Sequence, residues 1–485
     1  MIERDKFYIG GEWVDPVSDN VIGVISPHSE KVVGVVPDAG PADLDGAIAA
    51  ARTAMAGDWG HSTPHERAAV LAHLATEYAK RAEDVATAQV LEMGCPISQV
   101  REVMVDPSIA ALEYYSEVAS TYEQEERRDG RGGIVSVVRR RPIGVVGAIV
   151  PWNGPNYLSM LKIGPAMVAG CATVLKPAPE APLDLYFLAE AAIAAGVPPG
   201  VLNIVAGGRE TGEYLVMHDD VDKVSFTGSG AAGRRVAKLS GGRLRPATLE
   251  LGGKSAAIVL EDADLDKTLA GLAVNCFINS GQVCSLDSRV LVHRSRVVEF
   301  TEAFVAMASS LKVGDPFDPE TKIGPLVAER QRDRVEGYIQ AGLDAGARLL
   351  TGGGRPPDQP TGWYIQPTVF DQVHPDMKIV REEIFGPVIS ILPYGTDDEA
   401  IALSNDSDYG LAGSIWTDDV ERALDLGSRQ YRNDGDQWIR LSDLRTVRRR
   451  QIQRTRARNG PGERSGLRRT PIGTIAARLA VGRDG

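Results

Sequence analysis

The pattern of hydrophobic and polar positions separates a helical first part of the chain from two later runs in which strands and helices alternate. In Thr53–Tyr122, apolar residues recur at helical spacing, as at Ala68 and Leu71. Arg131–Arg141 instead alternates apolar and polar residues, which predicts an exposed hairpin or an edge strand.

From Pro142 the pattern changes to short, continuously apolar strands separated by helices. Strands of this kind are typical of a parallel sheet that is covered on both faces, and they predict a doubly wound α/β domain. The predicted strands are Ile143–Val150, Thr173–Lys176, Val201–Val205, Lys223–Thr227 and Ala247–Leu251, and the predicted helices are Leu158–Val168, Leu183–Ala194, Thr211–Met217 and Ala231–Leu239.

A second α/β run follows the first. We expect two α/β domains that meet near Glu250–Lys254. In the second run the predicted strands are Ala256–Leu260, Arg289–His293, Ile365–Phe370 and Val388–Leu392, and the predicted helices are Leu265–Ser280, Val297–Lys312 and Arg330–Ala345.

The composition is that of a globular protein, but its charge is unevenly distributed. The 485 residues are 43% hydrophobic and 24% charged, which excludes wholesale disorder. The formal net charge of −12 disfavours binding to nucleic acid or to an anionic membrane. Arg429–Gly485, however, holds 15 Arg, no Lys and 5 acidic residues, a net charge of +10, and therefore leaves −22 for Met1–Ser428.

Cysteine usage is sparse. The four cysteines do not form a C-x-x-C pair, and four in 485 residues do not make a disulfide scaffold, so we expect neither a zinc site nor structural disulfides. Met1–Gly10 does not resemble a signal peptide. These features predict a cytoplasmic protein without a metal.

The segment Gly228-Ser-Gly-Ala-Ala-Gly233 has the spacing G-x-G-x-x-G. It follows a predicted strand and opens a predicted helix, which is the context in which this motif binds a dinucleotide pyrophosphate through backbone N–H groups. A tight strand-to-helix turn without a ligand is the alternative.

Glu250 has three interpretations. It follows Gly233 by 17 residues, near the position at which dinucleotide-binding domains hold a ribose with an acid. It also leads the segment Glu250-Leu-Gly-Gly-Lys254, where a carboxylate beside a broken strand could act as a general base. An exposed glutamate at a strand end is the third interpretation.

Cys284 lies in the polar, loop-like stretch Asn279-Ser-Gly-Gln-Val-Cys284-Ser, and this distinguishes it from the other cysteines. A thiol at a helix end that follows a candidate base suits covalent catalysis, although a lone cysteine can also be purely structural. The remaining cysteines have apolar, Ala or Gly neighbours and are interpreted as packing residues: Cys95, Cys171 and Cys276.

Six segments, in this order along the chain, resemble the NAD(P)-dependent aldehyde dehydrogenase family. The resemblance extends from about Phe7 to Leu426. The segments are Pro151-Trp-Asn153, Leu175-Lys-Pro177, Phe226-Thr-Gly-Ser229, Leu249-Glu-Leu-Gly-Gly-Lys254, Gly281-Gln-Val-Cys284 and Glu382-Glu-Ile-Phe-Gly-Pro387.

The resemblance implies the oxidation of an aldehyde to a carboxylic acid through a cysteine thiohemiacetal and a thioester. Cys284 matches the nucleophile, and the oxyanion would be held by the Asn153 side-chain amide and the Cys284 backbone N–H. Glu250 matches the base that activates the hydrolytic water, so its ribose role is abandoned. Lys162 matches a further active-site lysine.

The other matches concern the cofactor. Lys176 matches the residue that hydrogen-bonds the adenosine ribose, and Glu383 and Phe385 match the pair that positions the nicotinamide ribose and ring. The pyrophosphate turn would use Gly228, Ser229 and Gly233, and the cofactor cleft would be lined by Ile149, Val150, Pro151 and Trp152.

The resemblance also implies a domain plan. Residues 1–122 and 145–251 would form the dinucleotide-binding domain, residues 123–144 an oligomerisation hairpin, and residues 252–428 the catalytic domain. A homodimer or homotetramer that acts on a small aldehyde is expected. Residues 429–485 would form a disordered tail that does not belong to the family pattern.

Two positions of the site depart from the family pattern. Members that prefer NAD usually carry a Glu three residues after the ribose-binding lysine, whereas this chain has Pro179 followed by Glu180. NAD is the expected cofactor and NADP stays open. At the substrate mouth, aromatic residues common in some members are replaced, which predicts a roomy apolar mouth without a strict preference for charged substrates: Gly154, Leu158, Leu161 and Ile278.

The C-terminal tail differs from the family pattern over a longer stretch than these positions do. The family continues past Leu426 with a strand, a Pro-Phe-Gly-Gly turn and an intersubunit strand, and none of these is present in the sequence as written. Permitted codons for Asp443–Asn459, when they are translated one nucleotide downstream, spell Thr-Ser-Ala-Pro-Phe-Gly-Gly-Val-Lys-Ser-Ser-Gly-Leu-Gly-Arg-Glu. The hypothesis is a frameshift between about Gly427 and Trp438. A basic tail that binds nucleic acid is the alternative.

Three functional classes therefore stay open at this stage. The first is an aldehyde dehydrogenase that releases a carboxylic acid. The second is a relative that passes the thioester to coenzyme A or phosphate, which Glu250 argues against because acylating members typically lack this base. The third is a copy impaired or inactivated by its altered C-terminus.

Overall fold

The computed structural model describes residues 1–129, 134–429 and 438–441. Contacts divide this part of the chain into two compact units, each with its own large sheet. The first unit comprises Met1–Leu251, Asp315–Thr321 and Thr361–Trp363, and the second comprises the rest, beginning at Gly252. Two short segments from the later half of the chain thus belong to the first unit, which the sequence pattern did not predict.

The first unit is built on a seven-stranded sheet of strand order β12-β11-β8-β9-β10-β2-β3. The five strands from β12 to β10 are parallel, and β2 and β3 add an antiparallel edge. Each of the five parallel strands falls within a predicted strand or extends it by one residue, so the prediction of a parallel α/β sheet is confirmed. The strands are β2 (Phe7–Ile9), β3 (Glu12–Val14), β8 (Val145–Ile149), β9 (Ala172–Lys176), β10 (Leu202–Ile204), β11 (Lys223–Thr227) and β12 (Ala247–Glu250).

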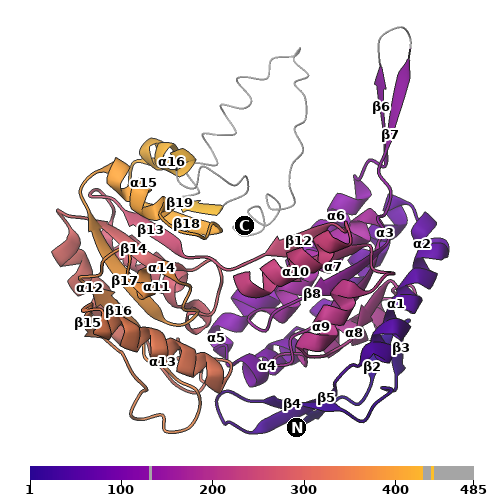
Figure 1. The fold of residues 1–485 in the computed structure, drawn as a ribbon, viewed down its shortest axis with the longest axis horizontal. Helices are drawn as coiled ribbons and strands as arrows, with labels where there is room; N and C mark the ends of the chain where they lie inside the picture. Colours follow the sequence, from indigo (N-terminus) through magenta and orange to yellow (C-terminus); the bar gives the residue numbers. More distant parts are fainter. Residues whose placement is uncertain (130–133, 430–437, 442–485) are drawn as a thin grey trace. The chain divides into compact units, whose positions relative to one another are not determined.

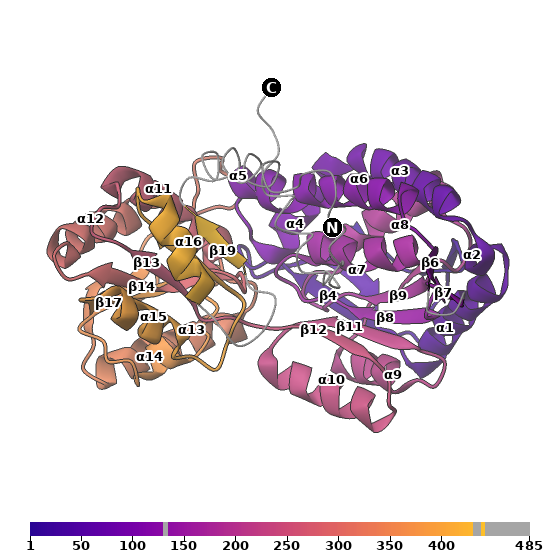
Figure 2. The same ribbon diagram turned by 90° about the horizontal axis from the view of Figure 1, so that it is seen from above.

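Helices cover both faces of this sheet. Figure 2 shows α7 (Pro155–Ala169) and α8 (Asp184–Ala194) on one face, and α9 (Arg209–Met217) and α10 (Gly230–Gly242) on the other. The predicted double winding is therefore present. The helices between β3 and β8 are α1 (Pro41–Ala56), α2 (Asp58–His61), α3 (Pro64–Ala79), α4 (Ala82–Met93), α5 (Ile97–Val100), the π-helical η1 (Arg101–Val105) and α6 (Asp106–Ser120).

Two small sheets accompany the large one. The strands β1 (Ile2–Glu3), β5 (Val32–Pro37) and β4 (Val21–Ile25) form the first. The second is the antiparallel pair of β6 (Glu125–Asp129) and β7 (Val135–Arg139), which is the predicted hairpin. Figure 1 shows this pair projecting from the helices beside it.

The second unit contains another seven-stranded sheet, of order β15-β16-β17-β14-β13-β18-β19 (Figure 1). Its neighbouring strands are parallel except for the pair β15–β16. The strands are β13 (Ser255–Val259), β14 (Asp287–His293), β15 (Arg348–Thr351), β16 (Thr368–Asp371), β17 (Val388–Tyr394), β18 (Ala412–Trp416) and β19 (Trp438–Leu441). The helices are α11 (Leu265–Phe277), α12 (Val297–Ser310), α13 (Glu329–Asp344), α14 (Lys378–Arg381), α15 (Asp397–Asn405) and α16 (Val420–Arg429).

One predicted helix was too long. The helix expected over Leu265–Ser280 ends at Phe277 and is followed by the short 3₁₀ segment η3 (Ile278–Gly281). Asn279 and Ser280 have φ of 49° and 56°, in the left-handed region, and this conformation cannot continue an α-helix. The hydrophobic pattern could not reveal this because the residues involved are polar and buried.

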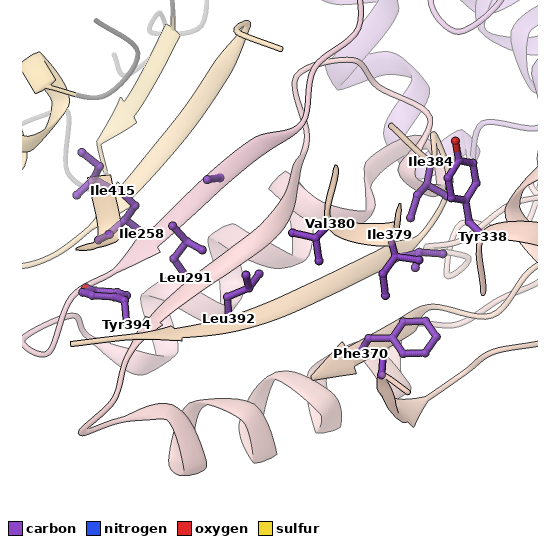
Figure 3. Close-up of a cluster of buried hydrophobic side chains, with 14 of the residues drawn as sticks. Ile258, Leu291, Tyr338, Phe370, Ile379, Val380, Ile384, Leu392, Tyr394 and Ile415 are labelled. Atoms are coloured by element: carbon purple, nitrogen blue, oxygen red, sulfur yellow. The ribbon is translucent and has the colours of Figure 1, made fainter. Parts of the chain in front are cut away.

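The core of the second unit lies on the sheet face shown in Figure 3. Buried side chains from the central strands, such as Ile258 and Leu291, pack with others from α13 and α14. Figure 3 shows Tyr338 and Ile384 side by side at one end of this cluster. Burial of Ile384 anchors the loop between α14 and β17, because burying such a side chain stabilises its position by about 2 kcal/mol.

The predicted tail falls mostly outside the described residues. Residues 430–437 and 442–485, with the proposed out-of-frame reading of Asp443–Asn459, are among those not described. Trp438–Leu441 form β19, which pairs in parallel with β18, so the expectation of disorder was wrong for these four residues. No helix among the described residues has the length and apolar character needed to cross a membrane.

A buried pair of carboxyl groups links α4 to α8. Both oxygens of Glu92 accept backbone N–H groups at the start of α8, from Leu183 (2.7 Å) and Asp184 (3.0 Å). The Asp184 carboxyl accepts a hydrogen bond from Gln89 Nε2 at 2.9 Å. All three of these side chains are fully buried, and burial raises the pKa of Asp184 to about 7 and the pKa of Glu92 well above its usual range.

Replacing Asp184 by Asn should stabilise the protein at pH 8 and have little effect at pH 4. Since the folded-state pKa lies above the ordinary 3.8, the stabilisation by the protonated carboxyl is present at low pH and is lost as the pH rises towards 7. An amide carries no charge and keeps a donor that could reach Gln89 Oε1, which is without a partner among the described residues. Denaturant unfolding at pH 8 should show a gain on the order of 1–2 kcal/mol.

Asp264→Asn is the matched control for this substitution. Asp264 caps α11 by accepting the Lys267 N–H at 3.0 Å, and this hydrogen bond lowers the pKa of its carboxyl. The control should therefore lose stability at pH 8. A loss for Asp184→Asn at the same pH would show that Asp184 functions as a buried carboxylate.

Candidate active site

The strand register of the first unit gathers several predicted site residues at one edge of its sheet. Ile149, at the end of β8, is paired with Lys176 on β9 and with Phe226 on β11. On the next strand Glu250 is paired with Thr227. Because the four strands are parallel, their carboxyl ends meet at this edge, which is where ligands bind in open α/β sheets.

The turn after β11 leads directly into helix α10. Ser229 is the N-cap of the 13-residue helix α10, and its hydroxyl accepts the Ala232 N–H at 3.3 Å. The Gly228 N–H donates to the Glu250 carbonyl at 3.0 Å, which ties the turn to β12. A β-carbon at Gly233 would overlap the Leu251 side chain, so a larger residue there would require that side chain to move.

Two buried lysines lie in the same unit. Burial lowers the pKa of Lys162 to about 8 although the negative charge of Glu250 opposes the shift, and Lys162 Nζ donates to Ser225 Oγ at 3.2 Å. Lys176 is 4% exposed, and its ammonium donates to the carbonyls of Pro177 (2.7 Å) and Gly207 (2.6 Å). Burial lowers the pKa of Lys176 to about 8 as well.

The segment after β8 leads from the sheet edge into α7. The Val150 N–H donates to the Lys176 carbonyl at 3.1 Å, so the chain stays paired with β9 for one residue beyond the strand. Pro151 and Trp152 are half-buried, and Asn153 is buried at 7% exposure. Helix α7 then begins at Pro155, a residue that suits a first helical turn because it needs no N–H partner there.

Cys284 differs from the other three cysteines in its exposure. It is partly exposed, whereas Cys95, Cys171 and Cys276 are buried. Burial raises the pKa of each of those three thiols, to about 12 for Cys95, and so keeps them protonated and unreactive. Cys284 lies in a turn that is closed by the Leu286 N–H, which donates to the Val283 carbonyl at 3.3 Å.

The glycine pair Gly252–Gly253 contacts two predicted site residues of the second unit. The Gly253 N–H donates to Glu383 Oε1 at 3.2 Å, and a β-carbon at Gly252 would overlap the same carboxylate. A β-carbon at Gly253 would lie 2.6 Å from the Cys284 carbonyl oxygen. The pair thus brings Cys284 and Glu383 to one place, where a pocket is lined by Gly253, Val283, Glu383, Phe385 and neighbouring residues.

Helix α13 holds the turn that carries Glu383 and Phe385. Phe385 has a φ of 65°, which is strained for a residue with a side chain. Gln331 Nε2 donates to the Phe385 carbonyl at 2.7 Å, and Arg334 donates to the Glu383 carbonyl at 2.6 Å. Tyr338 adds a hydrogen bond from its hydroxyl to Glu382 at 2.6 Å.

The sequence analysis did not identify Gln331, Arg334 or Tyr338. These residues precede the turn by about fifty positions, and they match no motif quoted above. Their spacing of three and four residues places them on one face of α13, which is a detectable signal only once the partner of that face is known.

Lys254 was also missed as a buried charge. It is 2% exposed, and its Nζ has no hydrogen-bond partner among the described residues. Burial lowers the pKa of Lys254 to about 7, and the positive charge of Arg289 adds to the effect. Among the described residues, no group of three or more His, Cys, Asp or Glu side chains could hold a metal ion.

Comparison with known proteins gives the same family as the motifs. The sequence model described as "Aldehyde dehydrogenase family" matches residues 13–432. The chain is 44% identical over 429 residues to geranial dehydrogenase of Castellaniella defragrans, an alignment that covers 88% of this chain and 89% of that one. It is 38% identical to chloroplastic betaine aldehyde dehydrogenase of Amaranthus hypochondriacus, with 87% of each covered.

Solved structures agree with the sequence relatives. An aldehyde dehydrogenase of Mycobacterium tuberculosis complexed with NAD+ has a TM-score of 0.88 at 46% identity, with 90% of each chain covered. A cysteine-to-alanine mutant of aldehyde dehydrogenase C from Pseudomonas syringae, in complex with NAD+ and octanal, has a TM-score of 0.86 at 39% identity, with 90% of this chain and 88% of that one covered. The chain therefore belongs to the aldehyde dehydrogenase family.

Proposed function

We propose that this protein oxidises an aldehyde to a carboxylic acid with NAD+ and that Cys284 is the nucleophile. The observation that carries the proposal is the accessibility of Cys284 beside the turn of Glu383, while the other three thiols are buried. A thiol must be reachable to attack a carbonyl carbon, and only this one of the four is.

The residues present suit a dinucleotide cofactor. The first turn of α10, Gly230-Ala-Ala-Gly233, carries no acidic residue and no side chain larger than a methyl group, so a pyrophosphate could approach its N–H groups. Lys176 has three N–H donors, of which two are used by carbonyls, and the third suits a ribose hydroxyl. Glu383 offers a carboxylate to a second ribose.

The rest of the cofactor site is proposed from the family resemblance. Phe385 would position the nicotinamide ring, and Ile149, Val150, Pro151 and Trp152 would line the cleft. NADP remains an alternative because Pro179 stands where NAD-preferring members carry a glutamate. The relatives solved with NAD+ support NAD as the first choice.

The proposed chemistry assigns one task to each catalytic side chain. The Cys284 thiolate attacks the aldehyde carbon, and the Asn153 amide and the Cys284 N–H stabilise the oxyanion that forms. The bound cofactor supplies the acceptor for the hydride that leaves this thiohemiacetal. Glu250 then removes a proton from water as the water attacks the thioester, and the carboxylic acid and free thiol are released. Lys162, buried near Glu250, supplies a titratable amine beside this base.

We propose an apolar aldehyde as the substrate. The residues expected at the mouth are Gly154, Leu158, Leu161 and Ile278, none of which carries charge. Of the two sequence relatives named above, the geranial dehydrogenase is the more similar at 44% identity, and the structure from Pseudomonas syringae holds octanal. Betaine aldehyde, named for the relative at 38% identity, carries a permanent charge that an apolar mouth would desolvate at a cost.

The alternative is an enzyme impaired by its C-terminus. It is supported by the +10 charge of Arg429–Gly485 and by the family-like translation of Asp443–Asn459 in the next frame. The family's Pro-Phe-Gly-Gly turn and intersubunit strand would then be missing, although β19 follows α16 and pairs with β18. Since the exposed valines of β7, Val135 and Val137, suit a subunit contact, a homodimer or homotetramer weakened by this loss is part of the alternative.

Two variants separate the proposed roles of nucleophile and base. Cys284→Ala should abolish both the first turnover and the steady state, by at least about 10⁴-fold in kcat. Glu250→Gln should keep a burst of one NADH per active site and lower the steady-state rate about 10²–10⁴-fold, because only thioester hydrolysis needs the base. Rapid-mixing absorbance at 340 nm measures both phases.

The controls for this experiment are Cys171→Ala, a buried thiol, and Glu213→Gln, a partly exposed carboxylate of the unit that contains Glu250. Both should keep the burst and the steady state. A steady state in Cys284→Ala equal to that of the unchanged protein would overturn the proposal.

Substrate class is tested by comparing aldehydes at saturating NAD+. We expect kcat/KM for geranial or octanal to exceed that for betaine aldehyde by at least about tenfold, which corresponds to about 1.4 kcal/mol of desolvation. Equal values for the charged and apolar aldehydes would contradict an apolar mouth.

The tail hypothesis is tested at the level of the gene and of the protein. Resequencing should reveal a one-nucleotide difference between the codons of Gly427 and Trp438. A frame-corrected chain should show higher soluble yield, a larger oligomer by light scattering and at least tenfold higher activity than the chain as written. Full activity of the chain as written would refute the impairment.

A further inference from the structure

The loop before Cys284 has a backbone conformation that residues with a β-carbon rarely adopt. Three successive residues have positive φ: Asn279 (49°), Ser280 (56°) and Gly281 (77°). For a residue with a β-carbon this conformation costs about 1–2 kcal/mol. It therefore persists only where surrounding contacts hold it in place.

We propose that Gln282 is a positioning residue that fixes the backbone of the Cys284 turn by holding Asn279 and Val327 together. The inference rests on the proposed function, in which Cys284 is the nucleophile. Nothing in the chemistry described above requires Gln282 itself to contact the substrate.

Both ends of the Gln282 side chain make hydrogen bonds. Its Nε2 donates to the Asn279 carbonyl at 3.2 Å, and its Oε1 accepts the Val327 N–H at 3.0 Å. Its own backbone N–H also donates to the Asn279 carbonyl, at 3.0 Å. Gln282 is 1% exposed, so these bonds form away from water, where leaving one unmade would cost about 1–3 kcal/mol.

A second hydrogen bond attaches the same loop to the same segment. Ser280 Oγ donates to the Gly324 carbonyl at 2.9 Å. Gly324 and Val327 belong to the stretch that leads into α13, so two side chains of the strained loop are attached to one support. These two hydrogen bonds are specific because they require the Gly324 carbonyl oxygen and the Val327 N–H at fixed positions.

On its other side the loop is packed against the turn of Glu383 and Phe385. A β-carbon at Gly281 would overlap the backbone of Gly386, and Pro387 N would lie 2.6 Å from it. Val327, which receives the Gln282 side chain, lies two residues before α13, the helix that also holds the Glu383–Phe385 turn through Gln331 and Arg334. Gln282 thus connects the loop that carries Cys284 to the segment before α13, the helix that also holds the Glu383–Phe385 turn.

Only one residue separates Gln282 from Cys284. The turn Val283–Leu286 follows directly, and the Cys284 carbonyl packs against Gly253. A shift of the Gln282 backbone would therefore move the thiol and its N–H together. A misplacement of about 1 Å in a reacting group lowers a rate on the order of 10²-fold.

The test compares Gln282→Met with Gln89→Met. Methionine fills the volume of glutamine without its hydrogen-bonding groups, and Gln89 is a fully buried glutamine of the other unit. Both variants should unfold at lower temperature. Only Gln282→Met should lower kcat and the alkylation rate of Cys284 by iodoacetamide, each by about 10²-fold, with the KM for NAD+ within about threefold of the unchanged protein.

Gln282→Glu supplies a readout that a merely structural role would not move, and it serves where the Met variant fails to fold. The carboxylate keeps the acceptor for the Val327 N–H but faces the Asn279 carbonyl with a second acceptor. Protonation restores a donor there, so the alkylation rate and kcat, each relative to the unchanged protein, should recover as the pH falls.

The outcomes are distinct. Wild-type alkylation rates and kcat in both Gln282 variants would overturn the positioning role, and so would equal losses in Gln282→Met and Gln89→Met. Cys284→Ala, assayed in parallel, tests the proposed function separately. Full turnover in that variant would show that Cys284 is not the nucleophile, and the positioning role of Gln282 would then fail with the proposed function.

Discussion

The space left by the missing side chains of Gly252 and Gly253 is the constraint on which the site in the second unit depends. The carboxylate of Glu383 and the carbonyl of Cys284 both occupy positions that a β-carbon at this pair would invade. The pair lies just before β13, so a sheet strand fixes where the space is. Glycine is used here for close approach rather than for its conformational freedom, since neither residue has a positive φ.

Three buried lysine side chains place a second, electrostatic constraint on the two units. Lys162, Lys176 and Lys254 are all nearly fully buried, and burial lowers the pKa of each to between about 7 and about 8. A buried amine in this range can lose its proton near neutral pH, whereas a surface lysine keeps it. The cost of burying these groups is offset by core packing elsewhere, which is how sites of this kind are accommodated in stable folds.

Much of the fold could be predicted from the sequence because strands that are buried on both faces leave an unambiguous pattern. The strands from Val145 to Glu250 were placed within a few residues, and the helices between them followed. β18 was missed although it is fully buried, because the sequence analysis ended its second run near Leu392. The end of α11 was misplaced because its cause is a backbone conformation that polar residues adopt only in tertiary context.

The candidate site was also only partly predictable from the sequence. Cys284, Glu250 and the glycine turn were proposed from motifs, since the proposed chemistry requires particular residue types at short spacing. Gln331, Arg334 and Tyr338 could not, because they act on main-chain and side-chain groups about fifty residues away.

The left-handed run Asn279–Gly281 also decides where this protein can vary. Its residues are buried and held on both sides, so a change within the run alters the whole loop that carries Cys284. Ile278 directly precedes the run and is partly exposed. Because Ile278 is a proposed mouth residue that lies just outside the run, a substitution at position 278 could change the proposed substrate range and leave the loop that carries Cys284 intact.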